Sequence, residues 1–303
     1  MKGIILAGGS GSRLYPLSQV ASKQLQPIYD KPMVYYPLST LLENGINEIA
    51  LISTPQDLPR FEDLLGNGSQ WGISIEYLSQ PKPEGIAQAF IIAEEFIGSE
   101  SVSLILGDNI FYGAGQFEDA FKEHETGATI FAYKVNDPTR YGVVEVDEAG
   151  KAVSIEEKPK NPKSSYAVPG LYLFDSLVCQ LARKLRPSAR GELEVADIMC
   201  DYIERGSLQV RVLKRGVAWL DSGTSQSLHE ASAFVQTMEK RQGIKIGCPE
   251  EAALLAGLIS LDVLDARIQT LPDCEYRDYL RGISVEKHGA SSSNPSLEHH
   301  GRS

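Results

Sequence analysis

A glycine-rich loop near the N-terminus carries the strongest chemical signal in this sequence. A short apolar segment leads into a loop that holds three glycines and two cations: Gly8, Gly9, Gly11, Arg13 and Lys23. Glycines allow backbone N–H groups to approach a phosphate without steric clash, while arginine and lysine add full positive charge. This combination predicts a phosphate-binding loop.

Two better-known phosphate-binding loops do not fit this segment. The dinucleotide fingerprint G-x-G-x-x-G requires a glycine where this chain has Leu14, and the pattern G-x-x-x-x-G-K-[ST] does not occur in the sequence. The missing third glycine counts against a nicotinamide-dependent dehydrogenase, which is another enzyme class built on doubly wound sheets.

Two aspartates each follow an apolar segment that is typical of a buried strand. Asp108 comes directly after LILG, and Asp221 follows the pair Trp219 and Leu220. A carboxylate at such a position suits a hard cation such as Mg²⁺. An aspartate there is equally typical of a turn or a helix cap. On this observation alone, both interpretations stay open.

A charged pair ends another expected strand. Glu157 and Lys158 stand directly before Pro159 in the segment IEEKPKNP. The lysine is suited to bind a phosphate, and the glutamate is suited to accept hydrogen bonds from sugar hydroxyls. Taken by itself, the pair also fits a solvated, charged strand end.

The elements that would position these residues alternate between strand and helix in the first half of the chain. Apolar runs predict strands at residues 2–7, 48–53, 73–78, 102–106 and 128–134. Helical patterns lie between them at residues 36–44, 57–65, 84–96 and 116–123. This order predicts an α/β fold with a Rossmann-like, mainly parallel sheet flanked by helices. Ligands would then bind beyond the carboxyl ends of the strands.

The second half changes character. Strands are expected at residues 142–146, 153–156, 169–174, 208–213 and 218–220, and helices at residues 175–185 and 194–205. From residue 225 onward we expect helices at 225–241, 249–256, 261–268 and 275–281. We therefore divide the chain into an α/β domain (1–241), a helical C-terminal extension (242–286) and a polar, disordered tail (287–303).

Composition limits the partners and the compartment. The net charge of −11 argues against nonspecific binding to nucleic acid or to an anionic membrane surface. The sequence contains no signal peptide and no apolar run of the ~20 residues that a membrane span needs. Its four cysteines form no CxxC pair, as expected for free thiols in the cytoplasm.

These segments together resemble the sugar nucleotidylyltransferases, and in particular their thymidylyl branch. The resemblance covers nearly all of residues 1–282. It is carried by GGSGSRLYPL, SKQLQPIYDKPMVYYPLSTL, QPKPEGIAQAF, LILGDNIFYG, RYGVVEVDEAGKAVSIEEKPKNPKSSYAVPGLY, GELEVADI and AWLDSGTSQSLHEAS. It implies a nucleotide-diphospho-sugar transferase fold and Mg²⁺-dependent transfer of a thymidylyl group from dTTP to glucose 1-phosphate. The same chemistry with UTP, and a non-catalytic sugar-nucleotide sensor, remain as alternatives.

The resemblance also implies residue roles. The catalytic cations would be Arg13, Lys23 and Lys158, and the Mg²⁺ ligands would be Asp108 and Asp221. The nucleotide would contact Leu6, Gly8, Gly9, Gly11, Arg13, Gln24, Gln80 and Gly85. The sugar phosphate would contact Tyr141, Gly142, Glu157, Lys158, Val168, Arg190 and Trp219.

Relatives of this kind are generally homotetramers with a regulatory nucleotide site at a subunit interface. The run CPEE, from Cys248 to Glu251, resembles part of that site. Relatives usually carry an aromatic residue and an arginine soon after it, where this chain has Leu254 and Leu255. This departure puts feedback regulation by a dTDP-sugar in doubt.

Overall fold

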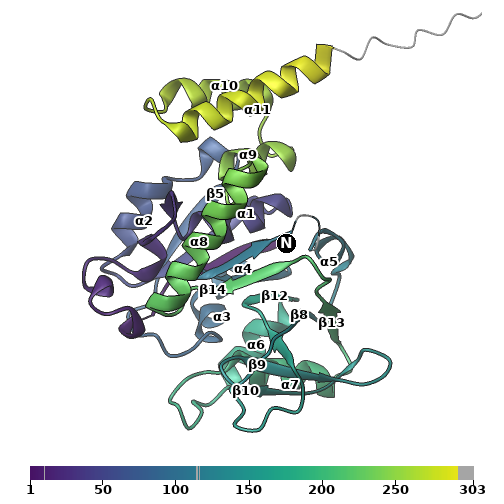
Figure 1. Ribbon diagram of the computed structural model, residues 1–303. Coiled ribbons are helices and arrows are strands. Elements are labelled where there is room, and N and C mark those ends of the chain that lie inside the picture. The colour runs from purple at the N-terminus through teal and green to yellow at the C-terminus, as the bar shows by residue number, and fades with distance from the viewer. Residues whose placement is uncertain (10, 114, 116, 293–303) are drawn as a thin grey trace, which may run out of the picture.

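One ten-stranded sheet forms the centre of the computed structural model, which describes residues 1–9, 11–113, 115 and 117–292 (Figure 1). Four parallel strands lie side by side in the order β6 (Val102–Leu106), β1 (Lys2–Leu6), β4 (Glu48–Ser53) and β5 (Ser74–Ser79). Because parallel strands point the same way, the loops after them emerge at one edge of the sheet. The predicted α/β class, with helices flanking a mainly parallel core and a C-terminal helical extension, is confirmed.

Antiparallel strands extend this core on one side. Next to β6 the order continues as β12 (Leu171–Phe174), β8 (Ala128–Lys134), β11 (Tyr166–Val168), β9 (Gly142–Val146) and β10 (Ala152–Glu157), with β13 (Leu208–Val212) also pairing with β8. The strand expected at 169–174 is found as β12, which begins only at Leu171, and the separate strand β11 before it was not anticipated. Pro169 has no N–H to give to a ladder, and the N–H of Gly170 bonds to a side chain instead.

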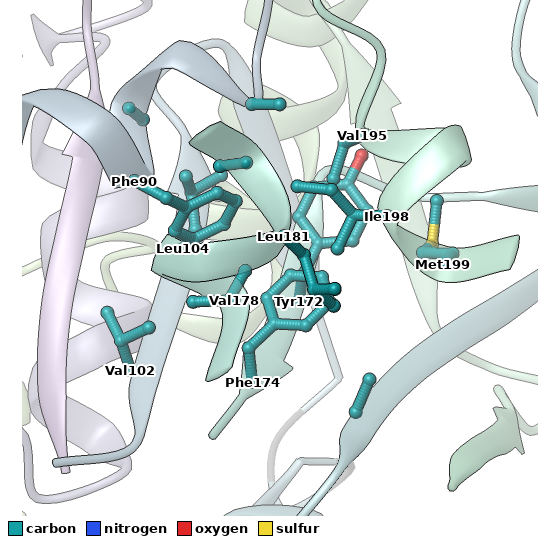
Figure 2. Packing of buried hydrophobic residues seen from close by; sticks show 14 of the residues in the cluster. Phe90, Val102, Leu104, Tyr172, Phe174, Val178, Leu181, Val195, Ile198 and Met199 are labelled. Carbon is teal, nitrogen blue, oxygen red and sulfur yellow. The ribbon is translucent and has the colours of Figure 1, made fainter. Parts of the chain in front are cut away.

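Side chains alternate between two cores along each central strand, as a period of two requires. Ile4 packs under the helices α3 (Gln88–Ile92), α6 (Leu177–Lys184) and α7 (Val195–Glu204). Figure 2 shows this core, where Phe90 meets Phe174 edge to face with ring centroids 5.2 Å apart. Ile5 faces the opposite core, under α1 (Tyr35–Glu43), α2 (Leu58–Leu65) and α9 (Pro249–Leu255). Both faces of the parallel strands are therefore covered.

A second, two-stranded sheet carries the site residues. β7 (Asn109–Tyr112) pairs antiparallel with β14 (Ala218–Asp221). We expected residues 218–220 to close the main sheet, which is wrong, and β7 was not anticipated. The partner of each strand lies more than a hundred residues away in the chain, so no local pattern announces the pairing.

The helix expected at residues 84–96 is shorter and interrupted. It begins only at Gln88, in α3, and a second helix, α4 (Glu94–Ile97), follows Ala93. Gly85 has φ 114°, a left-handed conformation that no helix interior contains, and the carbonyl of Glu84 accepts from the N–H of Leu193 (2.6 Å). Residues 84–87 are thereby held as a loop at the edge of the site.

The C-terminal part is helical, as expected. It comprises α8 (Ser225–Gln242), which starts with a Thr224–Ser227 capping box, then α9, α10 (Leu261–Thr270) and α11 (Glu275–Ser292). In Figure 1, α10 and α11 lie beyond α9, at the opposite end of the molecule from β9 and β10.

The tail does not begin at residue 287 as expected, because α11 continues to Ser292. In this last stretch His288 Nε2 lies 2.8 Å from Asp265 Oδ2 of α10, a contact that ties the two helices together. The rest of the expected tail, residues 293–303, lies outside the described residues. The division of the chain at 241/242 stays a prediction. Within the described residues, no helix has the length and apolarity to cross a membrane.

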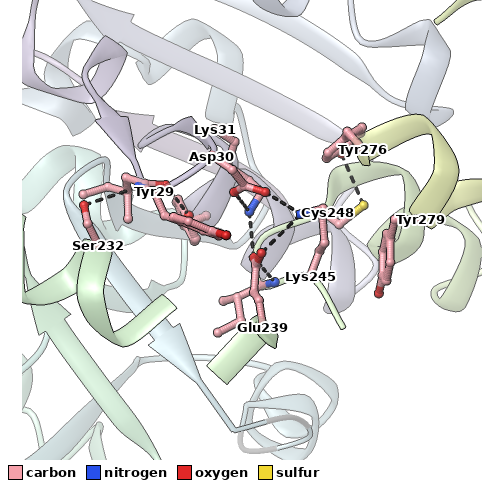
Figure 3. Close-up of polar contacts among 12 residues, drawn as sticks. Tyr29, Asp30, Lys31, Ser232, Glu239, Lys245, Cys248, Tyr276 and Tyr279 are labelled. Atoms are coloured by element: carbon pink, nitrogen blue, oxygen red, sulfur yellow. Dashed lines mark hydrogen bonds and ion pairs between the residues drawn. The ribbon is translucent and has the colours of Figure 1, made fainter. Parts of the chain in front are cut away.

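A buried ion network anchors the end of the glycine loop to these helices (Figure 3). The hairpin of β2 (Pro27–Ile28) and β3 (Lys31–Pro32) carries Lys31, whose ammonium lies 2.9 Å from Glu239 Oε1 of α8. Lys245, just after α8, pairs with the same glutamate (3.2 Å) and with Asp30. Removing one member of such a buried pair typically costs about 3–5 kcal/mol, so the hairpin is held firmly against α8.

Candidate active site

The glycine loop follows β1 directly, at the carboxyl edge of the sheet. Leu6 ends the strand, and Gly9 and Gly11 have φ values of 115° and 57°. A Cβ atom at Gly8 would lie 2.1 Å from Gln80 Oε1, and one at Gly107 would lie 2.7 Å from Gln24 Cγ. Ser10 lies outside the described residues. The glycines therefore serve both backbone turns and close approach of two buried amide side chains.

We expect Gly8→Ala to lower kcat/KM for the nucleotide by about 10²-fold, because displacing a substrate-contacting side chain by ~1 Å has effects of that size. The added methyl would push Gln80 away from the loop. Steady-state kinetics measure the effect. Gly282→Ala is the matched control, since no described atom lies within 4 Å of its added methyl. Unchanged kinetics in Gly8→Ala would contradict the close packing.

The expected nucleotide residues gather around this loop. Gln24 and Gln80 are each only 2% exposed, and Gln24 Nε2 donates to the carbonyl of Gly8 (3.5 Å). Gly85 lies in the loop after β5, where an added Cβ would lie 2.4 Å from the carbonyl oxygen of Leu193. Its conformation and its close packing both require glycine.

The two aspartates meet through the β7–β14 ladder. Asp221 is the register partner of Asn109, and the N–H of Ser222 donates to the carbonyl of Asp108 (3.2 Å). Asp108 is 8% exposed, and its carboxylate forms an ion pair with Lys23. The tertiary structure thus brings together two carboxylates and the loop lysine.

The electrostatics of the pair are unequal. Burial acts to raise the pKa of Asp108, but the charge of Lys23, together with hydrogen bonds from Lys23 and Asn109, holds it below the usual value. Burial, and next the negative charge of Asp108, raise the pKa of Asp221. Two carboxylates this close repel each other, and the charges of Lys23, Arg13 and Arg140 offset part of that repulsion at Asp221.

The donor set fits Mg²⁺. Lys23 places an ammonium on the carboxylate that a metal ion would contact. Among the described residues, no group of three or more His, Cys, Asp or Glu side chains could enclose a metal. Mg²⁺ typically takes one or two protein carboxylates and fills its remaining positions with water and phosphate oxygens. Asp108 and Asp221 would hold it in that way.

Two arginines approach the carboxylates. A Cβ at Gly223 would lie 3.1 Å from Asp221 Oδ1 and 3.4 Å from Arg13 Nη2, so this glycine leaves room for both groups. Arg140 was not expected from the sequence, yet its Nη2 lies 3.8 Å from Asp221 Oδ2. In the sequence, only its position directly before the expected residues Tyr141 and Gly142 could have pointed to a role for Arg140 in the site.

Three of the expected sugar-phosphate residues lie on three adjacent strands. Glu157 of β10 is the register partner of Gly142 of β9, which in turn pairs with Val168 of β11. A Cβ at Gly142 would lie 3.2 Å from Glu157 Oε2. Lys158 has φ 47°, which is unusual for a residue with a side chain, and its ammonium lies 3.3 Å from Glu157 Oε1. Such strain is often retained at functional sites.

Aromatic rings connect the strand ends around Glu157 to the segment that carries Asp221. The rings of Tyr141 and Trp219 lie 4.8 Å apart between centroids, and Arg190 Nη1 lies 3.4 Å from Glu157 Oε1. Burial, and then the charge of Asp221, raise the pKa of Tyr141. Contacts therefore link all seven expected sugar-phosphate residues to one another, with Trp219 two residues before Asp221 in β14.

Asn109 was missed by the sequence analysis, although it connects the two halves of the site. Its Oδ1 accepts from the indole N–H of Trp219 (2.6 Å) and from the N–H of Gly170 (2.9 Å). Its Nδ2 donates to Asp108 Oδ1 (3.0 Å). The side chain is 3% exposed, so these bonds fix the orientation of both Asp108 and Trp219.

Comparisons with known proteins agree with this geometry. The model of the nucleotidyl transferase family matches residues 2–238. Over 281 residues, the chain is 56% identical to the glucose-1-phosphate thymidylyltransferase of Mycolicibacterium smegmatis, covering 92% of this chain and 98% of that protein. It is 54% identical over 283 residues to the enzyme of the same name from Neisseria meningitidis serogroup A, with the same two coverages.

A solved structure adds the same result for the fold. A Bacillus anthracis protein, provisionally assigned as a glucose-1-phosphate thymidylyltransferase and crystallised with sucrose, aligns with a TM-score of 0.72. It shares 43% sequence identity, and the alignment covers 77% of this chain and 94% of that one. The chain therefore belongs to the nucleotidyl transferase family.

Proposed function

We propose that this protein transfers a thymidylyl group from dTTP to α-D-glucose 1-phosphate, giving dTDP-glucose and pyrophosphate. The observation that carries the proposal is the position of Asp108 and Asp221. They lie close to Lys23 and Arg13 of the glycine loop, and Asp221 also lies near Arg140, beside the strand ends that carry Glu157 and Lys158. The activity in the names of the similar enzymes supports the choice of substrates.

The roles of the residues follow from charge and position. The attacking phosphate oxygen of the sugar carries no proton to remove, so the reaction needs no general base. Repulsion between two anionic substrates is the main barrier. Arg13 and Lys23 would offset it at the triphosphate, and Lys158 would do so at the sugar phosphate. Mg²⁺ held by Asp108 and Asp221 would supply further positive charge at the phosphate oxygens.

The reaction is a direct, in-line displacement at the α-phosphorus, with pyrophosphate leaving on the far side. It requires no covalent bond between enzyme and substrate. The thymine would lie against Gln80 and Gly85, and the glucose would lie against Glu157 and the ring of Trp219.

The test is pyrophosphate release from glucose 1-phosphate and Mg²⁺ with dTTP, UTP, CTP, ATP and GTP in turn. Fast release with dTTP, abolished by EDTA or by omission of the sugar phosphate, is expected. Uracil differs from thymine by one methyl group, which is worth roughly 1–3 kcal/mol, and UTP also carries a ribose 2′-hydroxyl that dTTP lacks, so some release with UTP is also expected. If the folded protein released no pyrophosphate with any nucleotide, it would act as a sugar-nucleotide sensor.

We also propose that the protein forms a homotetramer and that its regulatory nucleotide site, if retained, lies near Cys248 and Glu251. A cavity of about 790 Å³ lies between α1, β7 and α9, and both Cys248 and Glu251 line it. Two of its lining groups are the carboxylates of Glu43 and Glu251, while Lys245 pairs with Asp30 and Glu239. A nucleotide bound here would meet the acidic side chains of Glu43 and Glu251. We therefore expect weak feedback inhibition by dTDP-sugars.

Glu43→Gln is expected to increase the free energy of unfolding at pH 8 by about 1 kcal/mol, after allowance for solvent screening, and to change nothing near pH 4. Although Glu43 is an exposed residue, desolvation of its carboxylate, and next the charge of Glu251, raise its pKa to about 7. The folded protein then binds this proton more tightly than the unfolded chain, so wild-type stability falls as pH rises from the ordinary value towards 7. Urea unfolding at both pH values measures the effect, with the exposed Glu286→Gln as control. A gain that is equal at both pH values would contradict this assignment.

We also place the enzyme in the cytoplasm. All four cysteines, Cys179, Cys200, Cys248 and Cys274, are free thiols. Free thiols are usual in a reducing compartment.

A further inference from the structure

The amide of Gln80 has only one orientation open to it, and a neighbouring glutamine imposes that orientation. Gln80 follows β5 and faces the glycine loop, where its Oε1 occupies the space of a Cβ at Gly8. An amide presents either an acceptor or a donor to a ligand, depending on which way it is turned. The turn of this amide therefore decides which hydrogen-bonding pattern a base must have.

The orientation is fixed first at Gln88, in α3. The backbone N–H of Glu84 donates to Gln88 Oε1 (3.0 Å), and Gln88 Nε2 donates to Glu84 Oε2 (2.9 Å). A backbone N–H can only donate, and an ionised carboxylate can only accept. Reversing the amide of Gln88 would set donor against donor and acceptor against acceptor.

The orientation is then passed to Gln80. Gln88 Oε1 also accepts from Gln80 Nε2, at 2.7 Å. One N–H of Gln80 Nε2 is thereby used, and the oxygen is left towards the glycine loop. None of the hydrogen bonds among the described residues is donated to that oxygen, so it remains an acceptor for a ligand N–H.

The backbone that carries this network is itself held in place. The carbonyl of Glu84 accepts from Leu193 N (2.6 Å), and Ala87 N donates to the carbonyl of Leu193 (3.2 Å). Gly85 lies between these two backbone hydrogen bonds, at a position with no room for a side chain. The two bonds hold the N–H of Glu84 in position, so its position does not depend on the Glu84 side chain.

We propose that Gln88 is a positioning residue that sets base specificity, by making Gln80 present only an acceptor to the nucleotide. This inference rests on the proposed function, in which Gln80 contacts the base. Thymine and uracil carry an N–H at ring position 3 and satisfy the Gln80 oxygen. Cytosine carries an unprotonated nitrogen there, which places two acceptors face to face. Gln88 thus selects bases of the thymine and uracil type over cytosine.

The test compares Gln88→Met with Gln88→Glu by measuring kcat/KM for dTTP and for dCTP. Methionine cannot accept the hydrogen bond from Gln80, so the amide can reverse, and the dTTP/dCTP ratio is expected to fall by about tenfold or more. Glutamate retains an acceptor for both Gln80 Nε2 and Glu84 N, and it is combined with Glu84→Gln so that its second oxygen faces an amide and not the Glu84 carboxylate. In that double variant the ratio should stay near the wild-type value. The KM for glucose 1-phosphate should not change in either variant.

Glu84→Gln is the matched control, because the anchoring N–H belongs to the backbone and remains. Thermal unfolding establishes that each variant is folded. If Gln88→Met does not fold, Gln88→Ala replaces it. A wild type that prefers dTTP, together with a Met or Ala variant of unchanged ratio, would overturn the inference. A wild type without turnover would instead refute the proposed function. In that case calorimetry would measure the binding of dTTP and dCTP, and the ratio of their dissociation constants would take the place of the ratio of kcat/KM values.

Discussion

Asp108→Asn is expected to lower kcat for pyrophosphate release by about 10³-fold or more, and to raise the Mg²⁺ concentration needed for half-maximal activity. The substitution removes one of the two carboxylates that, in the proposed function, would hold Mg²⁺ at the reacting phosphates. It also removes the ion-pair partner of Lys23, while the bond from Asn109 has to rearrange. A titration of activity against Mg²⁺ separates the loss of metal affinity from the loss of turnover.

The control for this variant is Asp119→Asn, which changes an exposed aspartate on α5 (Glu118–Glu123). Its activity and Mg²⁺ dependence should equal those of the wild type. Calorimetry with Mg²⁺ and a non-hydrolysable nucleotide gives a readout that is independent of turnover. Wild-type activity in Asp108→Asn would remove this residue from the metal site.

Arg13→Lys is expected to lower kcat by about 10²-fold or more, although the positive charge is retained. A guanidinium can bind two phosphate oxygens at once in a fixed plane, whereas an ammonium acts as a point charge on a flexible stem. The guanidinium of Arg13 lies where Gly223 and Asp221 leave room for it, so a shorter lysine would not reach the same place. Arginines that stabilise phosphoryl transfer contribute about 10³–10⁵-fold, of which the lysine should recover part.

Steady-state kinetics with varied dTTP and fixed glucose 1-phosphate check this expectation. Arg183→Lys serves as the control, because Arg183 forms a surface ion pair with Glu94. That variant should leave kcat unchanged. A loss in Arg13→Lys that appears only as a raised KM would mean that Arg13 binds the ground state and not the transition state.

The local elements could be predicted where a short apolar run has clear boundaries. The strands Val102–Leu106, Ala128–Lys134 and Gly142–Val146 have the bounds expected from the sequence. Each is an apolar run that ends at a glycine or a charged residue. The apolar residues predict a buried strand, and the glycine or charged residue predicts where that strand ends. The same reasoning predicted the phosphate-binding loop, because its glycines and cations are close together in the chain.

Elements whose bounds depend on distant partners were predicted less well. The start of α3 at Gln88 depends on Leu193, which holds Glu84 in a loop. The end of α11 at Ser292 goes with a contact from His288 to α10. A pattern within a few residues contains no information about either neighbour.

The sequence by itself determined the α/β class, the glycine-rich loop with its two cations, and which side chains are of a type that binds a phosphate, a sugar or a cation. Only the tertiary structure decided which of them meet. Asp108 and Asp221 are brought together by the β7–β14 ladder, and Asn109 joins them to Trp219. The amide of Gln80 takes its orientation from Gln88. Backbone pairing and hydrogen-bond direction between distant segments depend on the three-dimensional packing of the whole chain, which local residue types and spacings do not specify.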